Sequence, residues 1–169
     1  GGRDPGAVAR DGFEEKEVNV EVANLVIDLL QDRGYHVIYT RRSDEYTDFY
    51  QVAQKANAAG ADVFVSIHAN AAESNGDARG IEVLYAPAEG LSHKFDRQEP
   101  LARALSEETI RITGAENRGL VKRPNVVVIK NTNMASALIE VGFMTNDEER
   151  EQLNSRGYRA DLAKGIVNG

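Results

Sequence analysis

The sequence predicts an α/β domain with three layers, in which a mixed, mostly parallel sheet lies between helices. Some segments carry apolar residues every three or four positions, which is typical of helices with one buried side. Between them lie short, nearly unbroken apolar runs, which are typical of strands in a sheet covered by helices. The chain has 169 residues, and we expect one domain over residues 1–169.

The helices can be assigned in chain order. Apolar residues at helical spacing cover residues 16–33, and Gly34 follows as a natural terminator. Residues 49–59 and 100–113 are predicted as helices, the second with Pro100 in its first turn. Asn146 precedes three acidic residues and indicates the start of another helix, and residues 158–167 are predicted to form a closing one.

The strands are predicted from β-branched, aromatic and apolar runs at residues 35–41, 63–67, 81–85, 126–129 and 137–141. Residues 63–67 are expected to be covered on both faces, because their apolar run is almost continuous. Residues 89–99 contain Gly, His and Pro without a period and are predicted as a loop or lid.

Composition and charge exclude several classes of protein. Hydrophobic residues make up 41% and charged residues 28%, as in a folded globular protein. The chain contains no cysteine, so it has no disulfide, thiolate metal site or cysteine nucleophile. A net charge of −7 argues against nucleic-acid binding. We find no apolar run long enough for a membrane span, no signal peptide, and no motif of the nucleotide-binding or serine-hydrolase classes.

Three polar residues are candidates for a site at one edge of the sheet. His68 follows the apolar run 63–67, and Glu140 follows Ala137-Leu138-Ile139. Ligands of such sheets bind outside the carboxyl ends of the strands. Glu15 lies near the start of the first long helix, another element end that can face the same crevice. A cluster of His and carboxylates without cysteine is the ligand set of a catalytic zinc site.

Each of these residues also has a purely structural interpretation. A histidine at a strand end is more often a hydrogen-bonded structural residue than a ligand. Glu140 alone could be an ordinary exposed acid, and Glu15 could simply favour the N-terminus of a helix. His36 is interpreted as structural, and His93, in the lid-like loop, could contact a substrate.

Several segments, in a fixed order, resemble the zinc-dependent N-acetylmuramoyl-L-alanine amidases of bacterial autolysins, spore-cortex enzymes and phage endolysins. The segments are Gly1-Gly2-Arg3-Asp4-Pro5-Gly6-Ala7, Glu15-Lys16 with Asn19, Thr40-Arg41 with Asp44, Ala56-Asn57, Ser66-Ile67-His68-Ala69-Asn70, Gly80-Ile81-Glu82, Asn117-Arg118-Gly119-Leu120, and Leu138-Ile139-Glu140-Val141-Gly142-Phe143 with Asn146. The resemblance covers nearly the whole chain and implies a three-layer, phosphorylase/hydrolase-like fold.

The resemblance implies roles for individual residues. Glu15 and His68 would be ligands of Zn²⁺, and Glu140 would be the catalytic carboxylate. Arg118 would contact the substrate or orient Glu140, although an arginine that satisfies carbonyl groups in the turn before Gly119 is an equally good interpretation. The family's first zinc ligand is a His that precedes the Gly-Gly opening this sequence. We therefore expect the first strand and first metal-ligand loop to be missing, so that the chain as it stands could be inactive.

The implied reaction is hydrolysis of the amide between N-acetylmuramic acid and L-alanine in peptidoglycan, in the bacterial cell wall or periplasm. The expected partner is the glycan strand with its stem peptide, with a separate wall-binding domain or regulator as a further possibility. Two alternatives stay open. One is a non-catalytic peptidoglycan-binding or regulatory module with the same fold. The other is a zinc amidohydrolase that acts on a small amide, which would need a closed pocket rather than a long groove.

Overall fold

Four strands form one mixed sheet at the centre of the protein. The computed structural model describes residues 1–87 and 97–169. The strands are β1 (Val63–Asn70), β2 (Ile81–Tyr85), β3 (Asn117–Lys122) and β4 (Ala135–Phe143), and they lie in the order β1-β4-β2-β3. β1 and β4 are parallel, β2 and β3 are parallel, and the central pair β4 and β2 is antiparallel. The prediction of a mixed, mostly parallel sheet is confirmed.

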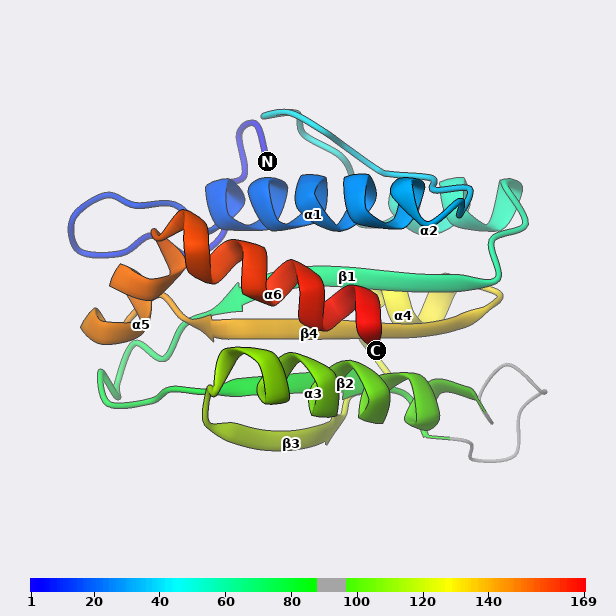
Figure 1. Cartoon of the computed structure of the whole chain (residues 1–169). Coiled ribbons are helices and arrows are strands. Elements are labelled where there is room, and N and C mark those ends of the chain that lie inside the picture. Colours follow the sequence, from blue (N-terminus) through cyan, green and yellow to red (C-terminus); the bar gives the residue numbers. More distant parts are fainter. Residues whose placement is uncertain (88–96) are drawn as a thin grey trace.

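Helices cover the sheet on both faces (Figure 1). On one face, α6 (Arg156–Asn168) packs between α1 (Glu15–Asp32) and α3 (Gln98–Thr113). α2 (Phe49–Ala58) and the short α4 (Val127–Asn131) pack together on the other face. α5 (Asp147–Leu153) follows β4 at the end of the sheet where β1 and β4 finish. The three-layer arrangement is therefore as predicted.

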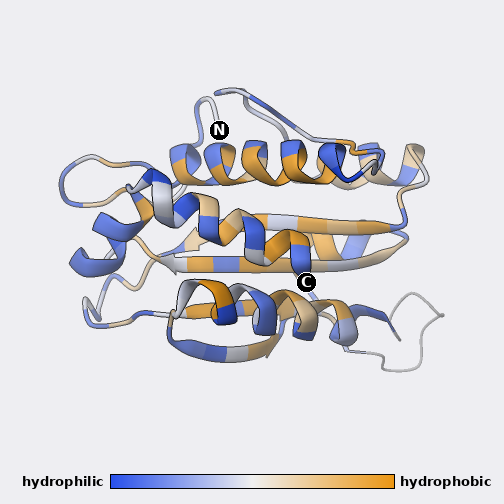
Figure 2. Ribbon diagram, in the orientation of Figure 1, coloured by the Kyte–Doolittle hydropathy of each residue, from blue (hydrophilic) through white to orange (hydrophobic). Residues whose placement is uncertain are grey.

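Alternate residues of each strand supply two apolar cores. The larger core joins α1, α3 and α6 to side chains such as Val83, Ile139 and Val141, and the smaller one joins α2 and α4 to Leu84 and Leu138. Figure 2 shows apolar segments along the strands and hydrophilic residues on the outer sides of the helices. Successive strand residues point to opposite faces, so the even-numbered residues of β1, β2 and β4 share the face that carries α2 and α4.

The predicted strand at residues 35–41 is wrong. Residues 35–41 form no helix or strand, and Tyr35 and Tyr39 are exposed. A strand is stable only when its backbone groups pair with a neighbouring strand, and residues 35–41 have no such partner among the described residues. Aromatic and β-branched composition alone could not reveal this.

A second strand prediction, at residues 126–129, is also wrong. These residues belong to α4 and its N-terminal cap, and Val128 and Ile129 are buried against the smaller core. A short apolar run does not distinguish a strand from a buried helical turn by its pattern. In contrast, β3 was not predicted as a strand, because Asn117-Arg118-Gly119 has low strand propensity.

The strand boundaries differ from the prediction in a way that matters for the site. β1 continues to Asn70 and β4 to Phe143, so His68 and Glu140 lie within strands rather than just after them. β1 is also the edge strand of the described sheet, and most of its side chains are only half-buried, so it is not covered on both faces as predicted. Of the predicted loop at residues 89–99, residues 89–96 lie outside the described part of the chain, and Gln98 and Glu99 already belong to α3.

Glu149 ties the ends of two central strands together. Its buried carboxylate accepts hydrogen bonds of 2.7 Å from the backbone N–H of Gly80, just before β2, and of Phe143, the last residue of β4. Burial raises the pKa of Glu149, while the two amide donors favour its charged form. Asn146 caps the helix that carries Glu149, as predicted, because its side-chain oxygen accepts a hydrogen bond from the backbone N–H of Glu149.

We expect Glu149→Ala to lower the free energy of unfolding by about 2–4 kcal/mol, because two buried amides lose their acceptor. Urea unfolding followed by circular dichroism would measure the loss. Glu151→Ala, an exposed position on the same helix, is the matched control and should change stability by less than about 0.5 kcal/mol. Equal stability of the two variants would contradict this role for Glu149.

Candidate active site

Three ionisable side chains form a row across neighbouring strands. His68 of β1 lies opposite Glu140 of β4 in the parallel pairing, and Glu82 of β2 lies opposite Glu140 in the antiparallel pairing. Residues paired in this way project from the same face of a sheet, with Cβ atoms roughly 5 Å apart. The sheet therefore brings one imidazole and two carboxylates together, with Glu140 in the middle.

Glu15, in the first turn of α1, joins this row through His68. One carboxylate oxygen of Glu15 accepts from Nδ1 of His68 at 2.8 Å, from the side-chain amide of Asn19 at 2.9 Å and from the backbone N–H of Ala69 at 3.3 Å. Its other oxygen accepts from the backbone N–H of Ala7 at 2.8 Å. These contacts fix the carboxylate beside the imidazole, although 53 positions separate the two residues in the sequence.

The N-terminal loop wraps closely around the Glu15 carboxylate. Gly6 has a φ of +69°, and a Cβ atom at this position would lie 2.3 Å from Oε2 of Glu15. Only glycine fits both the left-handed backbone and the close approach. Gly6 thus allows Ala7 to donate its hydrogen bond to Glu15.

The contact between Glu15 and His68 stabilises both charged forms. Burial alone would raise the pKa of Glu15, but hydrogen bonds from His68, Ala7 and Asn19 together with the His68 charge lower it to about 2. Burial alone would lower the pKa of His68, but its hydrogen bond to Glu15 and the charges of Glu15 and Glu140 raise it above the usual value. Both shifts describe one interaction, so they are not added together.

Glu140 has the opposite environment. Its Oε2 atom is buried and has no hydrogen-bond partner in the described part of the chain. Burial raises the pKa of Glu140 to about 7; the charge of His68 opposes this shift, and the charges of Glu15 and Glu82 add to it. A carboxyl group with such a pKa can both accept and donate a proton near neutral pH.

Glu82 connects the row to Arg118. One oxygen of Glu82 accepts from the side-chain amide of Asn70 at 3.0 Å, and the other accepts from Nε of Arg118 at 3.0 Å. Arg118 also donates to the backbone oxygen of Arg79 and lies 4.7 Å from the centre of the Phe143 ring. Arg118 therefore contacts Glu82. The described residues show no contact between Arg118 and Glu140, so a direct role of Arg118 in orienting Glu140 is not supported.

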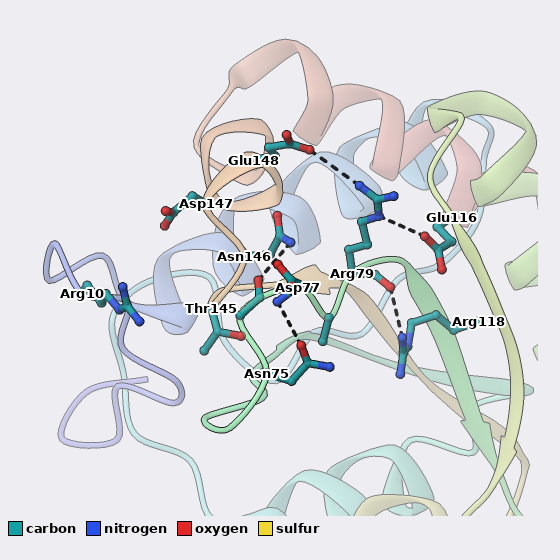
Figure 3. A pocket seen from close by; sticks show the side chains of 12 residues that line it. Arg10, Asn75, Asp77, Arg79, Glu116, Arg118, Thr145, Asn146, Asp147 and Glu148 are labelled. Carbon is teal, nitrogen blue, oxygen red and sulfur yellow. Dashed lines mark hydrogen bonds and ion pairs between the residues drawn. The ribbon is translucent and has the colours of Figure 1, made fainter.

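A polar hollow of about 770 Å³ is lined in part by Arg118 (Figure 3). Its walls come from the N-terminal loop, the turn before β2, the start of β3 and the segment that joins β4 to α5. The lining residues are Arg10, Asn75, Gly76, Asp77, Ala78, Arg79, Glu116, Arg118, Thr145, Asn146, Asp147 and Glu148. Glu15, His68 and Glu140 are not among them, so the hollow lies beside the row of ionisable groups rather than over it.

Comparison with known proteins decides the family. The profile of the N-acetylmuramoyl-L-alanine amidase family matches residues 1–169. The chain belongs to this family. The N-acetylmuramoyl-L-alanine amidase LytC of Bacillus subtilis is 32% identical over all of this chain, which covers 33% of LytC. The amidase AmiC of Neisseria meningitidis is 29% identical over all of this chain, which covers 49% of AmiC.

Solved amidase structures have the same fold. An N-acetylmuramoyl-L-alanine amidase from Clostridium difficile superposes with a TM-score of 0.92 at 31% identity, over 99% of this chain and 88% of that one. The catalytic domain of CwlV from Bacillus (Paenibacillus) polymyxa gives a TM-score of 0.90 at 29% identity, over 99% of this chain and 89% of that one. This chain thus spans half or less of LytC and AmiC but nearly all of an amidase catalytic domain.

Two side chains of this amidase-family domain have the chemistry of Zn²⁺ ligands. The carboxylate of Glu15 and the imidazole of His68 are both zinc-ligand types, and they already lie 2.8 Å apart. Within residues 1–87 and 97–169, no group of three or more His, Cys, Asp or Glu side chains is placed to hold a metal ion. The donor chemistry of the pair therefore fits zinc and supplies two of the three protein ligands that such sites use.

The outcome for the predicted residues is mixed. Glu15, His68 and Glu140 come together at one end of the sheet. His36 lies apart from the row, exposed in the irregular segment after α1, and His93 lies outside the described residues. Glu82 was not predicted as part of the site, because its partners Glu140 and Arg118 are distant in the sequence.

We expect Glu15→Gln to lower stability in a way that depends on pH. A carboxyl with a lowered pKa stabilises the folded state fully above its usual value of 4.5, and this contribution disappears as the pH falls toward about 2. The lowering of the Glu15 pKa from 4.5 to about 2 corresponds to about 3 kcal/mol in the free energy of unfolding. The free energy of unfolding of the wild type should therefore exceed that of the variant by about 2–3 kcal/mol at pH 6 and by less than about 1 kcal/mol at pH 2.

Denaturant unfolding in the presence of a chelator, repeated across this pH range, would measure the difference. Glu17→Gln changes an exposed carboxylate in the same helical turn and serves as the control. A difference in the free energy of unfolding between wild type and Glu15→Gln that stays constant from pH 6 to pH 2 would contradict the lowered pKa of Glu15.

Proposed function

We propose that this domain hydrolyses the amide between the lactyl group of N-acetylmuramic acid and L-alanine in peptidoglycan. The observation that carries the proposal is the buried oxygen of Glu140, which has no hydrogen-bond partner among the described residues and lies beside the pair formed by Glu15 and His68. An unpaired carboxylate oxygen is costly inside a protein unless a ligand or reactant uses it. Membership of the amidase family supports the reaction and the substrate.

Glu140 has the properties that a proton carrier for amide hydrolysis needs. Its free oxygen can accept a proton from the attacking water and then donate that proton to the departing alanine amine. A pKa of about 7 suits both steps, because neither protonation state is strongly favoured near neutral pH. His68 and Glu82 lie on either side of Glu140, on the two neighbouring strands.

Glu15 and His68 would hold Zn²⁺, together with a further histidine of the kind found in this family. When bound, the ion supplies Lewis-acid polarisation of the scissile carbonyl and lowers the pKa of water. The hydrogen bonds from Asn19 and Ala7 keep the Glu15 carboxylate oriented toward His68. Such outer contacts fix the position of ligand side chains.

The proposed place of action is the bacterial cell wall or periplasm, on the outer side of the cell membrane. None of the described helices is long and apolar enough to cross a membrane. The net charge of −7 gives no attraction to an anionic wall polymer, so we propose that a separate wall-binding domain or a regulator supplies anchoring. LytC and AmiC both extend well beyond the region matched here, which leaves room for such a domain in relatives.

We expect Glu140→Ala to abolish release of free amino groups from purified peptidoglycan, with a fall of at least about 1000-fold, while zinc content stays near that of the wild type. Chelation should remove activity in the wild type, and added Zn²⁺ should restore it. Glu107→Ala, an exposed position on α3, is the control and should keep full activity.

Two results would contradict this assignment. Equal loss of metal and activity in Glu140→Ala would make Glu140 a ligand rather than the proton carrier. A wild-type protein that binds peptidoglycan and zinc but releases no amino groups would instead be a binding or regulatory module with the amidase fold.

A further inference from the structure

Two charged residues that line the polar hollow beside the candidate active site form no ion pair within the part of the chain that the structure describes. Five of its charged lining residues are in ion pairs: Arg79 with Glu116 and Glu148, Arg118 with Glu82, and Asp147 with Arg150. Arg10 and the carboxylate of Asp77 have no such partner among the described residues, and they form no ion pair with each other. Figure 3 shows Arg10 on the N-terminal loop and Asp77 on the turn before β2, on different walls of the hollow.

The turn that carries Asp77 is held by a hydrogen bond within the turn and by contacts with the segment that follows β4. The backbone N–H of Asp77 donates to the side chain of Asn75 at 3.1 Å, and the side-chain amide of Asn146 donates to the backbone oxygen of Gly76 at 3.2 Å. The neighbouring Ala72 donates to Thr145 at 3.1 Å. The wall that presents Asp77 is therefore a defined surface, which is a requirement for selective binding.

Arg118 links the hollow to the row of ionisable groups, because it contacts Glu82, the strand neighbour of Glu140. Glu140 lies on β4, and Arg118, which lines the hollow, lies on β3, two strands away. Strands are separated by about 4.8 Å, so the backbones of β4 and β3 lie roughly 10 Å apart, a length that an extended peptide of three residues spans. None of the residues that line the hollow is aromatic, so it offers no platform for stacking a sugar ring.

We propose that the hollow binds the third residue of the stem peptide and recognises a side chain that ends in both a carboxylate and an ammonium group, as in diaminopimelate. Arg10 pairs with the carboxylate, and Asp77 pairs with the ammonium. This inference rests on the proposed function for the direction of the peptide, because the hollow then receives the chain that begins with the departing alanine. A zwitterionic group satisfies both unpaired charges without adding net charge to walls that are already neutralised in pairs.

Binding of three free tripeptides tests the proposal without any need for catalysis. The peptides are L-alanyl-γ-D-glutamyl-diaminopimelate and its analogues with lysine or norleucine at the third position. We expect the affinity to fall in that order, by about 3- to 10-fold at each step, as first the carboxylate and then the ammonium is removed. Titration calorimetry or NMR chemical-shift titration would measure the three dissociation constants.

Two variants assign the charges to residues. Arg10→Gln should reduce the affinity for the diaminopimelate peptide to that for the lysine peptide and leave the lysine peptide unchanged. Asp77→Asn should weaken both peptides and leave the norleucine peptide unchanged. Arg123→Gln removes the same charge at the opposite end of the sheet, where β3 finishes, and should leave all three affinities unchanged.

The proposal is overturned if the wild type binds the three peptides equally, or if neither variant changes the order. Hydrolysis of the same peptides linked to N-acetylmuramic acid separates this inference from the proposed function. Cleavage of all three at equal rates, with equal binding, would leave the amidase function standing and remove the recognition role. Selective binding without cleavage of any of them would do the reverse.

Discussion

His68 and Glu140 lie opposite each other because β1 and β4 are parallel and stay in register from Val63 and Ala135 up to these two residues. A slip of one residue would turn Glu140 to the other face of the sheet, into the core formed with α1, α3 and α6. The apolar alternation of β4 prevents this slip, since Ile139 and Val141 are fully buried on that face. Packing of the larger core therefore fixes the geometry of a polar site on the opposite face.

The same fold gives two nearby carboxylates opposite properties. Glu15 receives hydrogen bonds from a histidine, an asparagine and two backbone amides, whereas the buried oxygen of Glu140 receives none from residues 1–87 and 97–169. Donors around a carboxylate lower its pKa, and burial without donors raises it. Glu15 is consequently suited to remain charged beside a cation, and Glu140 is suited to carry a proton. Environment alone, with identical side chains, separates the two roles.

Local sequence signals were sufficient for the parts of the site that sit next to apolar runs. His68 and Glu140 follow such runs directly, and Glu15 opens a helix with clear periodicity, so their meeting at one sheet edge could be predicted. Residues 35–41 could not be predicted in the same way, because a strand needs a neighbour that composition does not show. Glu82, Arg118 and Glu149 depend on contacts between segments 36 to 69 positions apart, and no local pattern records these pairings.

Charge pairing in the hollow bears on how an acidic protein could select part of an anionic polymer. The net charge of −7 opposes long-range attraction, so selection has to come from contacts made at short range. Ion pairs such as that between Arg79 and Glu116 involve five of the charged residues that line the hollow, and this pairing weakens the electrostatic field inside it. Against that background, the isolated charges of Arg10 and Asp77 act on whatever group lies between them. Arg10 and Asp77 therefore discriminate between ligands by where the charges lie in the ligand. This discrimination does not depend on the net charge of the protein or of the ligand.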